Sequence, residues 1–435
     1  MELSTIRRVL LFLLIFLAPF HTGWIFRFHN GIFFIDVPLI LLIFLGFIDN
    51  RKFKFYWKIP AMGFIVWVLL TGMLAIRYDV VFSEITRFIR GYLVFLYVVN
   101  STRDKKDFNT LVIALFASFG FQSILGFIQW RSGYIGLSFL GEDSFWFRAG
   151  GLFSHPNVFA DFLIFNLPLV LRLFVFYKHK KRSHNIFFCA LFLSGLGALF
   201  ATYSRGAWLS FVGATVLMLL YSLFKYKFFP KVVSGVAFLV LLGTIFAVHY
   251  VPTVVSQFEA KNRQKAAAVR VPLNKVAFSI FADNAIWGVG MGQYTFHTHK
   301  YAHEHVTEEH DYYQLLQVVH NSFLLILSET GIVGFLFYGG IFFLIFKHGI
   351  RVMKNKNPYV SNMGLGILTG FLAFFIAMLA GPDLRDHQIQ MVFWILAGFL
   401  VVLSKVKSNY GRPKDGLTSN YKLKKMNGLA SRASI

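Results

Sequence analysis

Apolar runs long enough to cross a membrane recur along the whole of this 435-residue sequence. A helix needs roughly twenty apolar residues to span the hydrocarbon core of a bilayer. Backbone N–H and C=O groups must pair within the chain there, so each run is expected to be a helix. The composition agrees, since 56% of the residues are hydrophobic and the mean hydropathy is +0.60. The sequence therefore predicts an all-α polytopic membrane protein.

Each run of this kind predicts one transmembrane helix, which gives about 12 helices in all. Their expected bounds are 9–26, 32–48, 59–77, 82–100, 108–130, 158–177, 186–203, 207–224, 231–250, 321–346, 361–380 and 388–404.

One long polar stretch, 251–320, interrupts this series between the ninth and tenth helices. It separates nine helices at 1–250 from three more at 321–404, and a basic tail follows at 405–435. The single cysteine, Cys189, is expected inside a membrane helix, so no disulfide framework holds the loop. Binding and catalytic residues are often carried by loops, and this loop is the expected place for them.

Lys and Arg are concentrated in every second loop. The N-terminus, the alternate short loops and the tail hold 28 of the 43 basic residues, which marks the cytoplasmic side. Both termini are therefore expected in the cytoplasm, with the long loop outside the cytoplasmic membrane. The net charge of +23 does not indicate a nucleic-acid partner, because the excess lies beside cytoplasmic helix ends, where it contacts anionic lipid.

Outside the long loop, the outer side carries eight basic residues, and all eight are arginine. Arg makes planar bidentate contacts with phosphate and stays charged when partly buried. The pattern favours a phosphate-bearing ligand; the alternative is that some of these residues only anchor helix ends at the interface. The eight are Arg27, Arg77, Arg87, Arg90, Arg131, Arg148, Arg205 and Arg385.

Arg87 and Arg90 lie about one turn apart in a predicted span and share a helix face. A charge inside the bilayer costs roughly 2.5–3.5 kcal/mol, so both are candidates for ligand binding. Pairing of Arg87 with Glu84 is the alternative. Arg205 lies in a short outer turn, where Gly206 lets another backbone approach and the guanidinium can point into the bundle.

Two further candidates precede the sixth span. Pro156 closes the loop, and Asn157 is well placed to cap the helix that follows, which is the alternative to a role in ligand binding. His155 is a candidate for contacting sugar or phosphate.

Within the long loop, Arg270 leads an amphipathic stretch and is a candidate phosphate ligand, with a solvated position as the alternative. The glycines of 288–292 resemble a nucleotide loop only superficially, because no strand–turn–helix unit surrounds them; a tight backbone turn is expected. The histidines farther on do not form a typical zinc pattern, since their two His-x-His pairs lack a fixed partner. We therefore expect a solvated face and no metal at His297, His299, His303, His305 and His310.

His320 stands where the loop re-enters the membrane, beside Asn321. An imidazole here can take a proton from a sugar hydroxyl or donate a hydrogen bond to a phosphate. Glu329 lies about 180° round the helix from His320, so it cannot orient the imidazole and is expected to pair with an Arg on another helix. His320 is a catalytic candidate, and Asn321 and Glu329 are binding candidates; an ordinary interfacial His is the alternative.

Four motifs together resemble the O-antigen ligase and O-antigen polymerase superfamily. They are Phe-Ser-His-Pro-Asn at 153–157, Thr-Tyr-Ser-Arg-Gly-Ala-Trp-Leu at 202–209, Arg270 with the 283–292 stretch, and His-Asn-Ser-Phe-Leu-Leu-Ile-Leu-Ser-Glu-Thr-Gly-Ile-Val-Gly at 320–334. The last is the most specific, and the order and spacing of the motifs extend the likeness over nearly the whole chain.

The resemblance implies a GT-C-like, metal-independent, inverting glycosyltransferase without a cofactor. It would act on the outer face of the membrane on a polyprenyl-diphosphate-linked oligosaccharide, transferring glycan to an acceptor as a polymerase or a ligase. Arg205 and Arg270 would bind the diphosphate, and His320 would serve the acceptor hydroxyl or the leaving phosphate. Flippase and chain-length regulator proteins would be possible partners. The alternative is a polytopic transporter or flippase of a lipid-linked glycan, which should carry ionisable residues and interrupted helices near the midplane.

Overall fold

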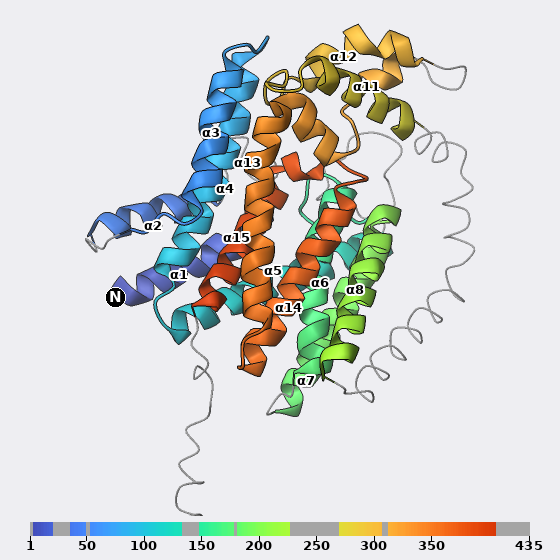
Figure 1. Cartoon of the computed structure of the whole chain (residues 1–435). Helices are drawn as coiled ribbons and strands as arrows, with labels where there is room; N and C mark the ends of the chain where they lie inside the picture. Colours follow the sequence, from blue (N-terminus) through green and yellow to red (C-terminus); the bar gives the residue numbers. More distant parts are fainter. Residues whose placement is uncertain are drawn as a thin grey trace, which may run out of the picture.

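In the computed structural model, the described residues are 3–20, 35–48, 53–132, 148–177, 181–226, 269–306 and 312–405, and they contain helices and no strand. Figure 1 shows the long helices gathered into one bundle. The α-helices are α1 (Leu3–Phe16), α2 (Asp36–Ile48), α3 (Lys58–Gly72), α4 (Tyr78–Ser101), α5 (Lys105–Ser132), α6 (Pro156–Phe176), α7 (Arg182–Ala201), α8 (Arg205–Tyr226), α11 (Arg270–Asp283), α12 (Tyr294–Ala302), α13 (Ser322–Met353), α14 (Pro358–Ala377) and α15 (His387–Ser404). Short 3-10 helices are η2 (His303–His305), η3 (Tyr312–Leu316) and η4 (Asp383–Arg385).

The predicted class, an all-helical polytopic membrane protein, is confirmed. Within the described residues, seven helices are long and apolar enough to cross a membrane: α5, α6, α7, α8, α13, α14 and α15. Helices α2 and α3 are apolar but shorter, and the predicted ninth span, 231–250, lies outside the described residues. The count of 12 therefore stays a prediction.

The centre of the bundle is formed by α6, α14 and α15. Nearly every residue of α15 is buried, which a single membrane helix facing lipid would not show. Trp394 of α15 is 1% exposed and packs where Gly91 of α4 leaves room, because a Cβ at Gly91 would meet its indole ring. Close approach at a glycine is how membrane helices gain contact area, since lipid tails are as apolar as the side chains.

Helices α11 and α12, from the predicted loop, form a small unit with its own apolar core at one end of the bundle (Figure 1). The unit is joined to a break in α13. Gly331 has a φ of 63°, which interrupts the helix, and the carbonyls of Ser328 and Glu329 accept hydrogen bonds from the N–H groups of Val289 and Gly290 at 3.0 and 2.8 Å. These carbonyl groups, which lose their helical partners at the break, therefore accept hydrogen bonds from the loop instead.

The glycines of this joint confirm the predicted turn. Gly288, Gly290 and Gly292 have φ values of 69°, 97° and 80°, a region that only glycine adopts readily. A Cβ at Gly288 would collide with the backbone of Glu329, and one at Gly331 with the carbonyl of Ile286. The two segments therefore approach too closely for any side chain to lie between them.

Candidate active site

The candidate site is built from the N-terminal ends of helices. His155 is the N-cap of α6, Arg205 is the first residue of α8 and Arg270 is the first residue of α11. His320 directly precedes the N-cap of α13, and Asp386 is the N-cap of α15. A helix N-terminus carries roughly half a positive elementary charge. Five such ends in one region make a strongly anion-attracting place in an otherwise apolar bundle.

Charge interactions connect the side chains at these ends. The pKa of His155 is lowered to about 4, chiefly by burial, also by the positive charge of Arg148, and by His320 when that imidazole is protonated. Burial also lowers the pKa of His320, and the neighbouring charge of Arg270 adds to the effect. Both imidazoles are therefore neutral at pH 7.

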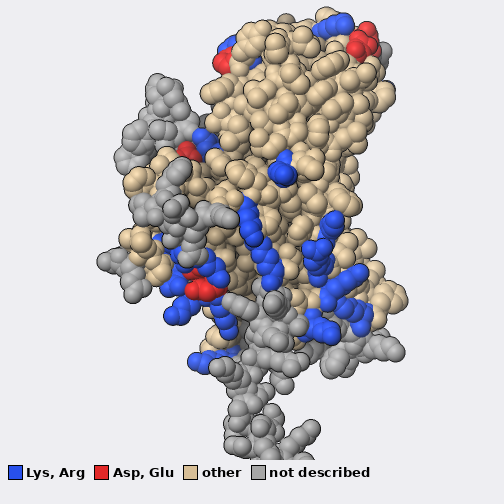
Figure 2. Space-filling model, turned by 60° about the vertical axis from the view of Figure 1, so that its left-hand side comes forward, with Lys and Arg blue, Asp and Glu red and all other residues tan. Residues whose placement is uncertain are grey.

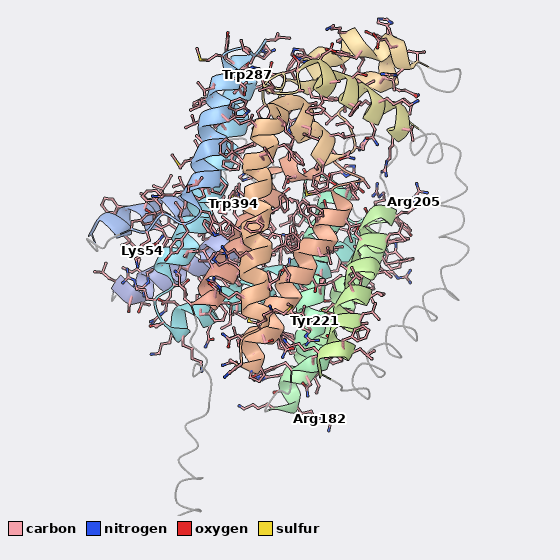
Figure 3. The ribbon with its side chains drawn as sticks, viewed as in Figure 1. Lys54, Arg182, Arg205, Tyr221, Trp287 and Trp394 are labelled. Carbon is pink, nitrogen blue, oxygen red and sulfur yellow. The ribbon has the colours of Figure 1, made fainter. Side chains whose placement is uncertain are left out.

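Arg270 extends the chain of interactions to Arg205. Partial desolvation lowers the pKa of Arg270, the positive charge of Arg205 lowers it further, and Asp383 opposes both. The side chain of Arg270 stays in contact with solvent, whereas Arg205, seen at the end of α8 in Figure 3, is half-buried. The structure thus brings together all three predicted catalytic residues, His320, Arg270 and Arg205, from three elements far apart in the sequence.

The predicted cap of α6 is wrong. Asn157 lies inside the first turn, and His155 takes the capping position instead, its Nδ1 accepting a hydrogen bond from the Asn157 N–H at 3.1 Å. The Asn157 side chain is occupied elsewhere, because its Oδ1 accepts from Arg148 Nη2 at 2.7 Å. Pro156, with no N–H to donate, fits the first helical position, so the cap lies two residues earlier than the sequence suggested.

Three acidic residues at the site were not predicted from the sequence. Asp161, in α6, is 3% exposed and shares a hydrogen bond with Asp383 of η4. The pKa of Asp383 is raised to about 6, chiefly by burial and also by Asp386, while Asp161 and Arg270 oppose the rise. Asp386 accepts a hydrogen bond from Ser154 Oγ at 2.7 Å and so ties α15 to the segment before α6. For Asp383 and Asp386 the sequence signal was the charged stretch 383–386 between two apolar runs.

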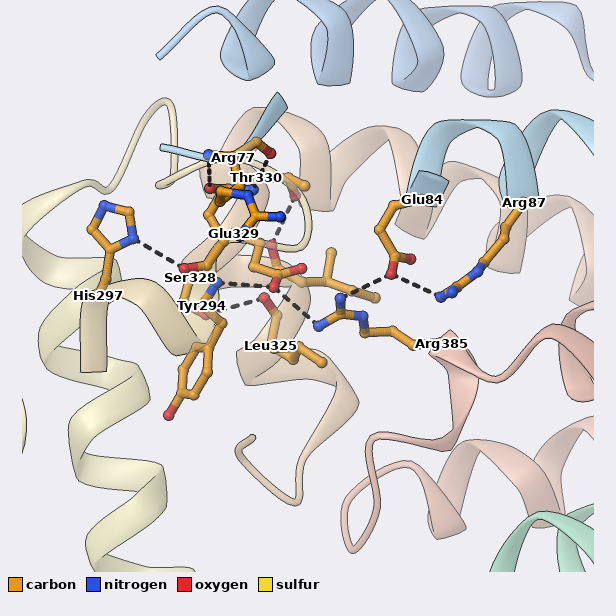
Figure 4. Close-up of polar contacts among 12 residues, drawn as sticks. Arg77, Glu84, Arg87, Tyr294, His297, Leu325, Ser328, Glu329, Thr330 and Arg385 are labelled. Carbon is orange, nitrogen blue, oxygen red and sulfur yellow. Dashed lines mark hydrogen bonds and ion pairs between the residues drawn. The ribbon is translucent and has the colours of Figure 1, made fainter. Parts of the chain in front are cut away.

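Glu329 pairs with Arg385, which confirms the expected partner on another element (Figure 4). Its Oε1 accepts from Arg385 Nη1 at 3.2 Å and from the Tyr294 N–H at 3.2 Å. Arg385 Nη2 also donates to Glu84 at 3.0 Å, and Glu84 in turn accepts from Arg87 at 2.8 Å. This chain of ion pairs links the α13 break, η4 and α4.

The remaining candidates have structural partners. The alternative for Arg87, pairing with Glu84, is confirmed, and Arg90 forms an ion pair with Asp36 at 2.8 Å. The side chain of Asn321 caps α13 by accepting from two backbone N–H groups. A role in ligand binding stays a prediction for each of them.

The loop histidines make separate contacts. A ring nitrogen of His297 lies 3.0 Å from the Gln293 carbonyl, one of His299 lies 2.8 Å from the Tyr312 hydroxyl, and one of His305 lies 3.1 Å from the Ser279 hydroxyl. Among the described residues, no three His, Cys, Asp or Glu side chains are placed so that they could hold a metal ion, and His310 lies outside these residues.

A family model described as O-antigen ligase matches residues 176–339. The predicted resemblance is confirmed. The match to the O-antigen ligases covers less than half of the chain, but it includes α8, α11, α12 and the first part of α13, and therefore Arg205, Arg270, His320 and Glu329. At the level of the family, this supports an O-antigen ligase or polymerase type of activity in the membrane. Among curated proteins, none matches the sequence.

Proposed function

We propose that this protein transfers glycan from a polyprenyl-diphosphate-linked oligosaccharide to the hydroxyl of a glycan acceptor, on the outer face of the cytoplasmic membrane. The observation that carries the proposal is the pair Arg205 and Arg270. The positive charge of Arg205 lowers the pKa of Arg270, so the two guanidinium groups, at the N-terminal ends of two helices, repel each other, and an anion bound between them would be attracted by both. A diphosphate supplies that anion.

The pair also explains how bond breaking would be assisted. As the bond between the anomeric carbon and the diphosphate oxygen breaks, negative charge grows on the leaving oxygen. Arginine side chains and N–H groups held at helix ends would stabilise that charge more than they stabilise the bound glycan donor, and this difference is what lowers the barrier. No metal is required, because the two arginines and the helix ends supply the positive charge.

The acceptor hydroxyl would attack the anomeric carbon from the side opposite the leaving diphosphate, with inversion. Its proton needs a base that is unprotonated at neutral pH. His320 meets this condition, because burial and Arg270 lower its pKa. The buried Asp383, with a pKa of about 6, lies within electrostatic reach of Arg270 and can orient that side chain or share the proton.

Polymerase and ligase would use this same chemistry and differ in the acceptor. In either case the acceptor must reach His320 beside the α11–α12 unit, so the surface of that unit is where acceptor choice would be made. A carrier is less well supported. The interruption of α13 at Gly331 has its backbone groups paired by loop residues, whereas a transported ion would need some of them free.

The test uses the purified full-length protein with a polyprenyl-diphosphate oligosaccharide and follows release of polyprenyl diphosphate and growth of the glycan. Arg205→Ala, Arg270→Ala and His320→Ala should each lower turnover by about 100-fold or more, the usual effect of removing one donor to a developing charge. Arg131→Ala, at the exposed end of α5, is the matched control and should keep its turnover. Full turnover in the first three variants would discard the site, and lipid movement without any diphosphate release would favour the carrier.

A further inference from the structure

A pocket lies at the end of α4 that is remote from the candidate active site. It encloses about 590 Å³ between α1, α2, the segment before α3, α4 and the end of α15. At its other end, α4 is preceded by Arg77, whose backbone is held by Gln293 of the α11–α12 unit at 2.9 Å. A helix of 24 residues is about 36 Å long. This pocket and the α11–α12 unit are therefore separated by about the thickness of a hydrocarbon core.

The lining of the pocket combines an apolar wall with a cationic mouth. Leu42, Leu93 and Val99 are among the residues that form the wall, and none of the described residues that line the pocket is acidic. Exposed Lys54 and Lys405 stand at the mouth, with Arg103 beside them. Figure 2 shows Lys and Arg gathered over this end of the molecule, away from the α11–α12 end, and Figure 3 places Lys54.

The charges of two of these cations, Lys54 and Lys405, are not compensated by an acidic residue in the described part of the chain. Neither the Lys54 nor the Lys405 ammonium group forms an ion pair with an acidic residue of the described part of the chain. The Lys405 Nζ lies 4.3 Å from the centre of the Tyr56 ring and 3.5 Å from the Val99 carbonyl, which holds it near the mouth.

Arg7 of α1 is a buried cation that also lines the pocket. Arg7 is 8% exposed and binds Asp107 through Nη2 at 2.9 Å, yet its Nε has no hydrogen-bond partner among the described residues. That Nε is buried away from the pocket and the charge of Arg7 is compensated by Asp107, so Arg7 is not a cation that a ligand can use.

The backbone that carries Lys54 is fixed. Its N–H donates to Asn100 Oδ1 at 3.1 Å, and its carbonyl accepts from Asn100 Nδ2 at 3.0 Å, so one side chain of α4 holds both. Next to it, the Tyr92 hydroxyl donates to the Tyr56 carbonyl at 2.6 Å. The mouth of the pocket is therefore preformed, which reduces the entropy lost when a ligand binds.

We propose that this pocket binds an anionic phospholipid of the leaflet opposite the α11–α12 unit. The phosphate headgroup lies between Lys54 and Lys405, and the first part of an acyl chain lies against the apolar wall. Cationic pockets between membrane helices are known to select such headgroups, and the volume falls in the range of small-ligand sites. The site is separate from the proposed transfer chemistry and does not depend on it.

The experiment is native mass spectrometry of the full-length protein in detergent, titrated with phosphatidylglycerol, phosphatidylcholine or soluble glycerol phosphate. Phosphatidylglycerol should bind, phosphatidylcholine should bind at least about tenfold more weakly, and Lys54→Ala/Lys405→Ala should lower phosphatidylglycerol affinity at least about tenfold. The matched control is Arg182→Ala/Lys347→Ala, which removes two cations that do not line the pocket and should change the affinity less than about twofold.

Equal binding of both lipids, or equal loss in the two double variants, would overturn the proposal by showing general surface attraction. Glycerol phosphate binding as tightly as the lipid would overturn the lipid assignment. If the double variant does not fold, Lys54→Glu alone repeats the test, because Lys54 is exposed. This variant reverses the charge at the mouth and should also abolish selectivity for the anionic lipid.

Discussion

Asp383 is a side chain of the site whose charge state depends strongly on its surroundings. Burial and Asp386 favour its protonated form, whereas Arg270 and a hydrogen bond from Asp161 favour the carboxylate. The result is a pKa of about 6, close enough to neutrality that a small pH change alters the charge beside Arg270. A carboxyl of this kind is common at catalytic sites, where acids and bases are tuned toward the working pH.

A pH profile of turnover tests this residue. The pKa of Asp383 is raised, so the group is ionised above about pH 6 and becomes protonated as the pH falls through that value. Turnover should therefore be level from pH 7 to 8 and decline below about pH 6. In Asp383→Asn the rate should be lower, and the contribution of Asp383 to the decline should vanish, so that only the titration of His320, whose pKa is lowered, remains. An unchanged decline in the variant would assign it to another group.

Arg385 is the residue on which the buried acidic groups depend. Its side chain is 24% exposed, whereas those of Glu84 and Glu329 are 4% and 3% exposed. Glu84 keeps Arg87 if Arg385 is removed, but Glu329 has no other cation among the described residues.

Removal of Arg385 should consequently destabilise the protein strongly. We expect Arg385→Gln to cost about 3 kcal/mol of unfolding free energy, because it leaves a buried carboxylate without its partner. Arg77→Ala, which breaks an exposed pair with Asp79, should cost about 1 kcal/mol or less. Denaturant unfolding in detergent measures both. Similar losses in the two variants would show that Glu329 does not rely on Arg385.

At the scale of elements, contacts with the loop and with α3 stabilise the break in α13. The indole of Trp67 in α3 donates to the Thr330 carbonyl at 2.7 Å, and its ring stacks on Trp287 of the loop with centroids 4.9 Å apart. Helix α3, the loop and α13 thus meet at the break in α13, where Trp67 contacts both of the other segments.

Glycine substitutions test this joint. Gly331→Ala and Gly288→Ala should each cost about 2–3 kcal/mol of stability, because both positions have positive φ and a Cβ would collide with backbone. Gly339→Ala, in the same helix as Gly331, is the control, since a Cβ there meets no atom within 4 Å. Thermal midpoints in detergent compare the three. Equal midpoints would mean that the break tolerates a side chain.

The sequence predicted the positions of most helices and the catalytic candidates, because apolar runs and polar turns are local signals. It missed what depends on three-dimensional packing. Asp161 looked like one polar residue in an apolar helix, and only the fold brings Asp383 to it. His155 replaced Asn157 as a cap for a local reason, the position of Pro156, which a stricter use of helix-start rules would have found.

For the whole molecule, the expected orientation makes a prediction that can be checked in cells. In a Cys189→Ser background, Glu304→Cys on the α11–α12 unit should react with a membrane-impermeant maleimide added outside. Lys356→Cys, before α14, should react only after permeabilisation, since the basic loops are expected inside. Both side chains are exposed, so a reversed pattern would reverse the proposed sidedness of the site.

The junction between the α11–α12 unit and α13 consists of main-chain hydrogen bonds and glycines on both partners. Chimaeras that exchange this unit between proteins therefore cannot treat it as a detachable module. A graft cut at 284 and 320 would carry only one half of the junction and leave the other half facing foreign backbone. Exchanges that keep 285–292 and 328–332 from the same parent, and vary only the surface between them, are the ones that should fold.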